Sequence, residues 1–443
     1  MPGRLEFDLN FGRPARRRDD GDPMRLLVLG DFSGSPVADR PPLATRPTQQ
    51  VDLDNVDNVM RRLRPRVRLA SGEVEFQQID DFHPDALYRR LELFQALRTA
   101  RSKPAADGGD VLGRLIGKPS EAGVARAATP ANPIDALIHQ IVAPHIVKDT
   151  SAETAAYVSA VDAAIAEQMR ALLHDPGFQS LEAAWRGVHW LISNLELDEN
   201  LQLHLFDVTR DELIADIVAS QGRLAETGLH GALVDRWRNV PGSQGWSALI
   251  GLLSFGPSDA DIGLLAALGL VASQAGGPLL AGADPALTGS DGLAGWQALR
   301  RSEAARWIAL AAPRLLLRLP YGGSSDPVET FTFEEFVGPP VHEELLWGSA
   351  SLAMAVLLGR SFTARGWDME PGDEREIGNL PAYTFVRDGE REMYPGAERF
   401  LTESQIQAIL QSGVVPLASR RDSHAVVAIR FQSIADPPAA LAW

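Results

Sequence analysis

The sequence predicts an α/β fold of more than one domain, and two observations lead to that prediction. Short apolar runs typical of buried strands, among them residues 24–30 and 246–255, alternate with longer segments whose apolar residues recur at helical spacing. The chain has 443 residues, which is too long for one small hydrophobic core. We therefore expect two or three domains of mixed α/β structure.

The first part of the N-terminal region contains signals for two strands and a helix. Residues 4–11 alternate between apolar and polar residues and predict a strand, which a charged loop follows. Residues 24–30 are a short apolar run that ends in the turn sequence Asp-Phe-Ser-Gly, as a buried strand does. Asp52 and Asp54 can cap a helix that Pro65 ends.

A hairpin and a second helix are expected next. Residues 67–69 and 74–76 predict two strands joined around Ser71 and Gly72. A helix then starts near Asp81, with Pro84 in its first turn. Its apolar face consists of Leu87, Leu91, Phe94 and Leu97.

Residues 102–133 are rich in Ala, Gly and Pro with scattered charges, a composition typical of a linker. Three helical segments are predicted after it, over residues 133–142, 155–173 and 174–195. The linker therefore divides the chain into a shorter N-terminal region and a longer C-terminal one.

Strands and helices alternate in the remaining sequence. Residues 201–205 predict a strand, and Thr209 to Glu212 form a capping box that opens a helix. A strand over residues 246–255 precedes another apolar helix, and an apolar strand is expected before the Pro-Tyr-Gly-Gly turn at 320–323. Near the end of the chain we expect a helix capped by Thr402 and stopped by Gly413, and a strand over residues 425–431.

Composition excludes several classes of function. The formal net charge of −16 argues against nucleic-acid binding, which needs Lys and Arg against phosphate. An acidic surface keeps a chain soluble or faces a basic protein partner. The absence of cysteine excludes disulfides, thiolate nucleophiles and cysteine-based metal sites. No signal peptide and no apolar run of the roughly 20 residues of a membrane span are evident, so we expect a cytoplasmic protein without membrane insertion.

Two acidic groups invite a chemical interpretation. His342, Glu343 and Glu344 suggest metal binding, but a zinc site needs three protein ligands in a defined geometry, and a capped helix start explains them better. Asp207, Asp211 and Glu212 could be paired carboxylates for acid–base work. Capping and the helix dipole already account for acidic residues at a helix start.

Other motifs lack the context that catalysis requires. The glycines of the Leu-Gly-Asp-Phe-Ser-Gly segment at residues 29–34 are not followed by the Gly-Lys-Ser/Thr of a phosphate-binding loop. Ser254 and Ser302 lie outside a Gly-x-Ser-x-Gly elbow. The sequence therefore predicts no catalytic residue, no metal site and no cofactor, and we expect that the protein is not an enzyme.

The segment from Trp296 to Gly322 carries an arginine-rich helical face. Arg300, Arg301, Arg306 and Glu303 lie at helical spacing, and either an exposed salt-bridged face or an intersubunit contact explains them. The tryptophans of this and an earlier helix, Trp185, Trp190, Trp296 and Trp307, are expected in the core.

These segments, in matching order, closely resemble the two contractile sheath subunits of bacterial type VI secretion systems. The region around Trp296–Gly322, together with residues 176–191, 327–335 and 400–417, resembles the large subunit TssC of the EvpB family. Residues 24–34, 52–60 and 79–87 resemble the small subunit TssB. The resemblance implies a fusion, with a small TssB-like domain at 1–101 packed on a large TssC-like domain at 134–443, and a linker at 102–133.

The resemblance also implies a structural role in a helical assembly. Such a subunit would assemble with other sheath subunits or itself around an Hcp-type inner tube, then contract to expel it. Baseplate components and a ClpV-type disassembly ATPase are further implied partners, although the ATPase-binding helix is not evident here. This sequence is also shorter at its C-terminus than TssC, which leaves a second hypothesis: a non-polymerising cap, adaptor or regulator that docks on the sheath or baseplate.

Overall fold

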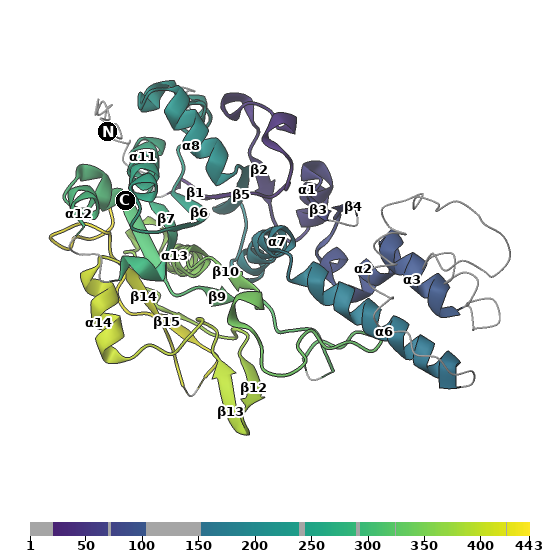
Figure 1. Cartoon of the computed structure of the whole chain (residues 1–443). Helices are drawn as coiled ribbons and strands as arrows, with labels where there is room; N and C mark the ends of the chain where they lie inside the picture. Colours follow the sequence, from purple (N-terminus) through teal and green to yellow (C-terminus); the bar gives the residue numbers. More distant parts are fainter. Residues whose placement is uncertain are drawn as a thin grey trace. The chain divides into compact units, whose positions relative to one another are not determined.

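The computed structural model describes residues 21–69, 72–102, 152–238, 244–288, 293–323, 325–421 and 423–443. Helices and strands alternate over most of these residues, so the predicted α/β class is confirmed (Figure 1). The predicted strand at 4–11, the linker at 102–133 apart from Ser102, and the helix at 133–142 lie outside the described residues. None of the described helices is both long enough and apolar enough to span a bilayer.

The largest element is a nine-stranded mixed sheet. Its strands, in spatial order, are β11 (Glu376–Ile377), β15 (Val426–Ala428), β14 (Val415–Ser419), β8 (Ile308–Ala312), β7 (Leu279–Ala283), β6 (Ala248–Phe255), β1 (Met24–Gly30), β5 (Leu201–Asp207) and β2 (Gln49–Val51). The six strands from β14 to β5 pair in parallel, whereas the pairs β2–β5, β14–β15 and β15–β11 are antiparallel.

β1 lies in the middle of this sheet, although it comes from the N-terminal region of the chain. Leu26 pairs with Leu203 of β5 on one side and with Ala248 of β6 on the other. All seven residues of β1 are buried, as expected for a parallel strand covered on both faces. The hydrophobic run from Met24 to Gly30 therefore forms a strand of the N-terminal region inside a sheet built mostly from the C-terminal region.

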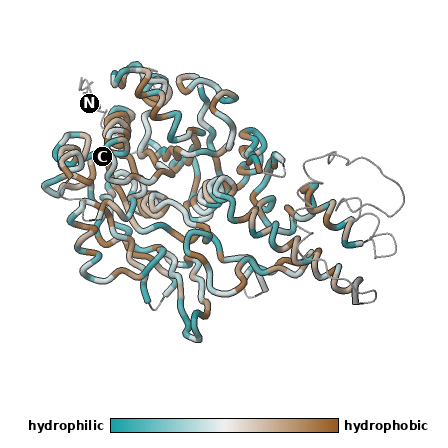
Figure 2. The backbone as a smooth tube through the Cα atoms, viewed as in Figure 1, coloured by the Kyte–Doolittle hydropathy of each residue, from teal (hydrophilic) through white to brown (hydrophobic). Residues whose placement is uncertain are grey.

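Helices cover both faces of the sheet (Figure 1). α8 (Arg210–Ala219) and α11 (Asp259–Ala275) pack on one face, where Leu27 and Leu29 of β1 join a large hydrophobic cluster. α13 (Ser351–Arg365) packs against β1, β5, β6, β7 and β8. Hydrophobic residues, brown in Figure 2, occur both in the centre of this unit and along the helices that cover the sheet.

The remaining described elements are shorter or peripheral. The other helices are α1 (Val56–Leu63), α2 (Pro84–Arg90), α3 (Glu92–Ser102), α6 (Ala152–Leu173), α7 (Pro176–Asn194), α9 (Gly228–His230), α10 (Arg236–Arg238), α12 (Ala294–Arg300) and α14 (Glu403–Gln411). Three two-stranded sheets pair β3 (Arg66–Leu69) with β4 (Gly72–Glu75), β9 (Leu315–Leu316) with β10 (Trp347–Gly348), and β12 (Tyr383–Arg387) with β13 (Glu390–Tyr394).

The chain forms two compact units whose boundaries differ from the regions expected from the sequence. Unit 1 draws on Met1–Leu63, Ala183–Leu319 and Leu345–Trp443, and contains the nine-stranded sheet. Unit 2 draws on Arg64–Glu182 and Pro320–Glu344. Each unit therefore takes residues from both the N-terminal and the C-terminal region. The expected TssB-like domain at 1–101, linker at 102–133 and TssC-like domain at 134–443 stay a prediction.

Several local predictions differ from the structure in detail. The helix expected after Asp81 is two helices, because Leu91 adopts an extended conformation between α2 and α3. The strand expected at 425–431 is limited to the three residues of β15. The helical face expected around residue 300 is interrupted, since α12 ends at Arg300 and a 3-10 turn follows from Glu303 to Trp307.

Candidate interaction site: a buried polar network at the carboxyl ends of β1 and β5

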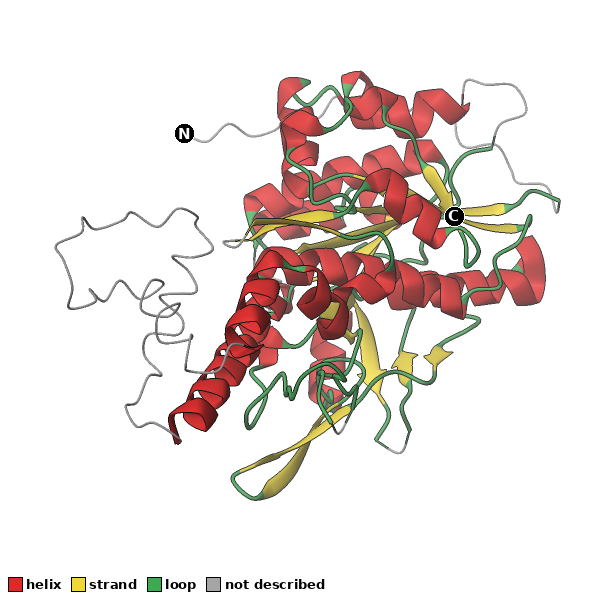
Figure 3. Ribbon diagram, turned by 90° about the vertical axis from the view of Figure 1, so that its right-hand side faces the viewer, coloured by secondary structure: helices red, strands yellow, loops and turns green. Residues whose placement is uncertain are grey.

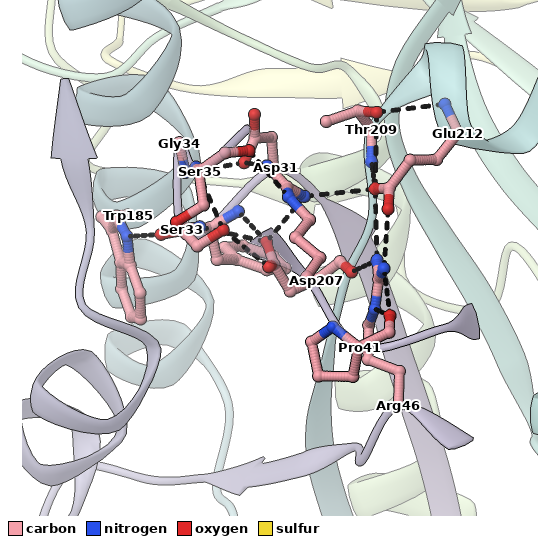
Figure 4. Close-up of polar contacts among 12 residues, drawn as sticks. Asp31, Ser33, Gly34, Ser35, Pro41, Arg46, Trp185, Asp207, Thr209 and Glu212 are labelled. Atoms are coloured by element: carbon pink, nitrogen blue, oxygen red, sulfur yellow. Dashed lines mark hydrogen bonds and ion pairs between the residues drawn. The ribbon is translucent and has the colours of Figure 1, made fainter. Parts of the chain in front are cut away.

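The carboxyl ends of neighbouring parallel strands are where open α/β sheets place their ligands. In unit 1, the loops after β1 and β5 meet at this edge, and three acidic side chains gather there: Asp31, Asp207 and Glu212. Side chains of the protein itself fill this edge of the sheet, because Arg40 and Arg46 of the segment after β1 contact these carboxylates. Figure 4 shows these contacts.

Asp207, the last residue of β5, fixes the turn that follows β1. Its Oδ1 accepts hydrogen bonds from the backbone N–H groups of Phe32 (2.8 Å) and Ser33 (3.0 Å), and its Oδ2 accepts one from the Ser33 hydroxyl (2.7 Å). The indole N–H of Trp185 donates to the Phe32 carbonyl at 2.8 Å. The turn is therefore held from β5 and from α7 together (Figure 4).

Arg46 is the most extensively bonded cation of the network. Its guanidinium makes two hydrogen bonds to Glu212, one to Oε1 at 2.6 Å and one to Oε2 at 3.1 Å. The same group donates to the backbone carbonyls of Asp207 (2.6 Å) and Pro41 (2.6 and 3.0 Å). Both side chains are about 95% buried, so the pair is a desolvated, bidentate ion pair.

Arg40 joins the remaining acids. It donates to Asp31 at 2.6 Å and to Glu212 at 3.3 Å, and it lies 3.4 Å from Asp207. Its Nε donates to the carbonyl of Ser35 at 2.9 Å. Two buried arginines thus balance most of the charge of three carboxylates, of which Asp207 and Glu212 are buried and Asp31 is partly exposed.

The electrostatics of the site follow from these contacts. Burial by itself would raise the pKa of Glu212, but the Arg46 hydrogen bond, the Thr209 backbone N–H and the charges of both arginines outweigh it and lower that pKa. Asp31 shows the opposite balance. Burial raises its pKa more than Arg40 lowers it, and the nearby charge of Asp207 adds to the increase.

The predicted capping box is confirmed and serves a second purpose. The Thr209 hydroxyl accepts from the Glu212 N–H at 3.1 Å, and the Glu212 carboxylate accepts from the Thr209 N–H at 3.0 Å. Glu212 also receives the two arginines, a role that the capping pattern did not indicate. Asp211, the neighbouring acid, is exposed and lies outside the network.

A second junction of this kind occurs within unit 2. The carboxylate of Asp85, at the start of α2, accepts hydrogen bonds from the backbone N–H groups of Glu329 (3.1 Å) and Thr330 (2.9 Å), and from the Thr330 hydroxyl. Tyr88 stacks on Phe331 with ring centroids 4.6 Å apart. Burial alone would raise the pKa of Asp85, but these donors outweigh it and lower that pKa.

The other candidate residues lie apart from these junctions. His342 has its Nδ1 3.2 Å from the exposed carboxylate of Glu343, and the described residues contain no His, Asp and Glu cluster of metal-site geometry. Ser254 is an exposed residue of β6, and the Ser302 hydroxyl donates to the Leu299 carbonyl.

The arginine-rich face is only partly as expected. Arg301, Glu303 and Arg306 are exposed, but Arg300 is buried, and its Nε donates to the Ile434 carbonyl at 2.9 Å. The tryptophans divide equally, since Trp185 and Trp296 are fully buried, whereas Trp190 and Trp307 are half-buried.

Comparison with known proteins assigns the two regions. Residues 155–435 match the family described as VipB, EvpB/VC_A0108, tail sheath N-terminal domain. The chain belongs to this tail sheath family. Residues 15–106 match a second family, described as "Type VI secretion system, VipA, VC_A0107 or Hcp2". The predicted resemblance to the large and small sheath subunits is therefore confirmed.

Two curated proteins of Pseudomonas aeruginosa are similar to the chain. The type VI secretion system sheath protein TssC1 is 30% identical over 305 residues, covering 63% of this chain and 61% of TssC1. The sheath protein TssB1 is 29% identical over 94 residues, covering 19% of this chain and 55% of TssB1. The chain thus spans less than two thirds of each relative.

One solved structure is also similar, a chain of the cryo-EM structure of the anti-feeding prophage (AFP) baseplate, 6-fold symmetrised. The two chains are 15% identical, with 55% of this chain and 48% of that chain covered and a TM-score of 0.29. The family assignment rests on the sequence matches alone.

Each of the two junctions contains residues from both family matches. Arg40, Arg46 and Asp85 belong to the region that matches VipA, whereas Glu212 and Thr330 belong to the region that matches VipB. The polar network in unit 1 and the Asp85 contacts in unit 2 therefore both join the two sheath-related regions.

Proposed function

We propose that this protein is a structural subunit of a type VI secretion sheath in which the small and large sheath components are fused in one chain. The observation that carries the proposal is the position of β1. This strand of the VipA-like region pairs with β5 and β6, both of the VipB-like region. The buried Arg46–Glu212 pair adds an ionic junction beside it.

Fusion has a direct physical consequence for assembly. Two components in one chain are present in equal numbers, and each meets the other at the high effective concentration that a covalent link provides. The strand that the two regions share in unit 1 keeps them together as one subunit of the proposed lattice.

The mechanism proposed for the assembled protein is mechanical. Subunits stack in an extended lattice around an Hcp-type inner tube and rearrange as rigid bodies into a contracted state that expels the tube. Glu212, the most buried carboxylate of the polar network, is paired with Arg40 and Arg46, which supports a structural role over catalysis. Baseplate components and a ClpV-type ATPase are the further proposed partners, and the cytoplasm is the proposed location.

The test is negative-stain electron microscopy with light scattering on the purified full chain, alone and mixed with its cognate Hcp-type protein. We expect hollow tubes that lengthen in the presence of the inner-tube protein. A monomer or small oligomer under both conditions would contradict the sheath proposal and favour a cap or adaptor that does not polymerise.

A pair of variants shows whether assembly depends on the junction. Arg46→Ala disturbs the polar network, whereas Arg61→Ala removes an exposed arginine of α1. If the fused regions act as one body, Arg46→Ala reduces the yield of tubes and Arg61→Ala leaves it unchanged. Thermal unfolding of both variants separates a loss of assembly from a loss of folding.

A further inference from the structure

A basic pocket lies in unit 1 where the β12–β13 hairpin meets the loop between β14 and β15. The residues that line it include Arg420, Arg421 and His424 of that loop, here called the basic wall, and Ala382, Met393 and Pro395 at the hairpin. The pocket has a volume of about 180 Å³. A cavity of about 150 Å³ holds a benzene molecule, whereas pockets for larger ligands measure about 300–1,000 Å³. The pocket therefore has room for one side chain rather than for a nucleotide.

The charge of this wall opposes the charge of the chain. The chain carries a formal net charge of −16, yet Arg420 and Arg421 are consecutive and both are exposed. Arg420 lies 3.3 Å from Glu376, but both side chains of that pair are about half exposed. Because exposed ion pairs contribute little free energy, an anionic ligand can compete for Arg420. Arg421 lies over the ring of Phe400 at 5.6 Å.

An exposed face of the hairpin leads into the pocket. Thr384 pairs with Met393, and Val386 pairs with Arg391, so these four side chains share one face of the two-stranded sheet. Val386 is 57% exposed and Met393 is 37% exposed. Figure 3 shows the hairpin extending away from the large sheet. Since Met393 also lines the pocket, the apolar face and the basic wall form one continuous surface.

We propose that this surface, formed by the outward face of β12–β13 and the basic pocket, docks an extended acidic segment of a partner protein. One side chain of the segment enters the pocket, apolar side chains lie on Val386 and Met393, and carboxylates face Arg391, Arg420 and Arg421. We choose an acidic partner because its carboxylates would be complementary in charge to the arginines of this surface. A nucleic acid fits less well, because the rest of this acidic chain would repel its phosphates. The inference does not depend on the sheath proposal.

The experiment measures fluorescence anisotropy of a short fluorescein-labelled peptide in which Glu alternates with Leu, titrated with the full chain. The double variant Arg420→Glu/Arg421→Glu should weaken binding on the order of tenfold or more, because two charge-assisted contacts become repulsive. The matched control is Arg61→Glu/Arg62→Glu, a consecutive exposed pair on α1. It should leave the affinity within about twofold, since long-range charge is screened by salt.

Four outcomes would overturn the proposal. They are the absence of peptide binding by the parent chain, equal loss of affinity in both double variants, equal binding of a peptide with Gln in place of Glu, and tighter binding of a labelled single-stranded oligonucleotide. Sedimentation of the chain alone adds an independent check. Self-association that Arg420→Glu/Arg421→Glu abolishes would assign the surface to a second copy instead. Circular dichroism of each variant establishes that it is folded.

Discussion

The junctions in unit 1 and unit 2 join the same two family regions by different chemistry. In unit 1, each family region contributes a charged side chain: Arg40 and Arg46 come from one region and Glu212 from the other, and all three are buried. In unit 2, the carboxylate of Asp85 is satisfied by neutral donors, two backbone N–H groups and a hydroxyl. A buried ion pair needs both of its members, whereas a carboxylate held by neutral donors leaves no unpaired charge when it is removed. The first junction is therefore the more sensitive to single substitutions.

The largest effect is expected from Arg46→Ala. This change leaves Glu212 buried with an unbalanced charge, and the free energy of unfolding should fall by about 3–5 kcal/mol. Replacing both members with apolar residues, as in Arg46→Met/Glu212→Leu, should cost much less. Urea unfolding of the parent and the two variants measures the difference. A double variant as unstable as Arg46→Ala would show that the lost backbone hydrogen bonds and packing, rather than the unbalanced charge, explain the loss.

Asp85→Ala should destabilise unit 2 by about 2 kcal/mol, because three donors lose their acceptor. Asp85→Asn keeps one acceptor oxygen and should lose less. Hydrogen exchange at the N–H groups of Glu329 and Thr330, which donate to Asp85, measures the loss of this junction directly and should become faster in Asp85→Ala. If Asp85→Ala costs more than Arg46→Ala, the contrast between the two junctions is wrong.

His204 makes unit 1 sensitive to pH. Burial, and secondly the charge of Arg25, lower the pKa of this histidine to about 3. The unfolded chain takes up the proton near pH 6.5 and the folded chain does not, so stability is full above pH 6.5 and falls as the pH drops. Linkage gives a loss of about 2 kcal/mol between pH 7 and pH 5. Urea unfolding at both pH values tests it, and His204→Gln should reduce the loss.

The smallest effect is expected at the edge of unit 2. Arg101 and Asp162 join α3 to α6 through two hydrogen bonds, at 2.5 and 3.1 Å, but both side chains are more than 40% exposed. Arg101→Ala should therefore lower the free energy of unfolding by less than about 1 kcal/mol. A larger shift in the urea midpoint would mean that the α3–α6 contact is a third main junction between the family regions.

Local signals predicted much of the fold but not the network. The run Met24–Gly30, the hairpin around Gly72 and the capping box at Thr209 each depend on neighbouring residues, so their patterns identify them. Arg40 and Arg46 lie in a proline-rich loop without periodicity, and their partner Glu212 is 166 residues beyond Arg46. Sequence spacing cannot report a contact at that distance.

The two compact units were unpredictable for the same reason. Composition indicated a boundary at the linker. In the structure, however, β1 from before the linker pairs with β5 and β6 from after it. Arg300 illustrates the same limit on a smaller scale. Its helical spacing indicated an exposed salt-bridged face or an intersubunit contact, whereas its side chain is buried and donates to the carbonyl of Ile434, far along the chain.

The central position of β1 also sets an order of events during synthesis. Its seven residues leave the ribosome early, but its partners in β5 begin at Leu201 and those in β6 at Ala248. At translation rates of 5–20 residues per second, this apolar strand waits roughly 9 to 35 seconds for the first of them. One of the first strands of the sheet to be synthesised is thus unpaired for that time. Chaperones that bind exposed apolar segments have this interval in which to act.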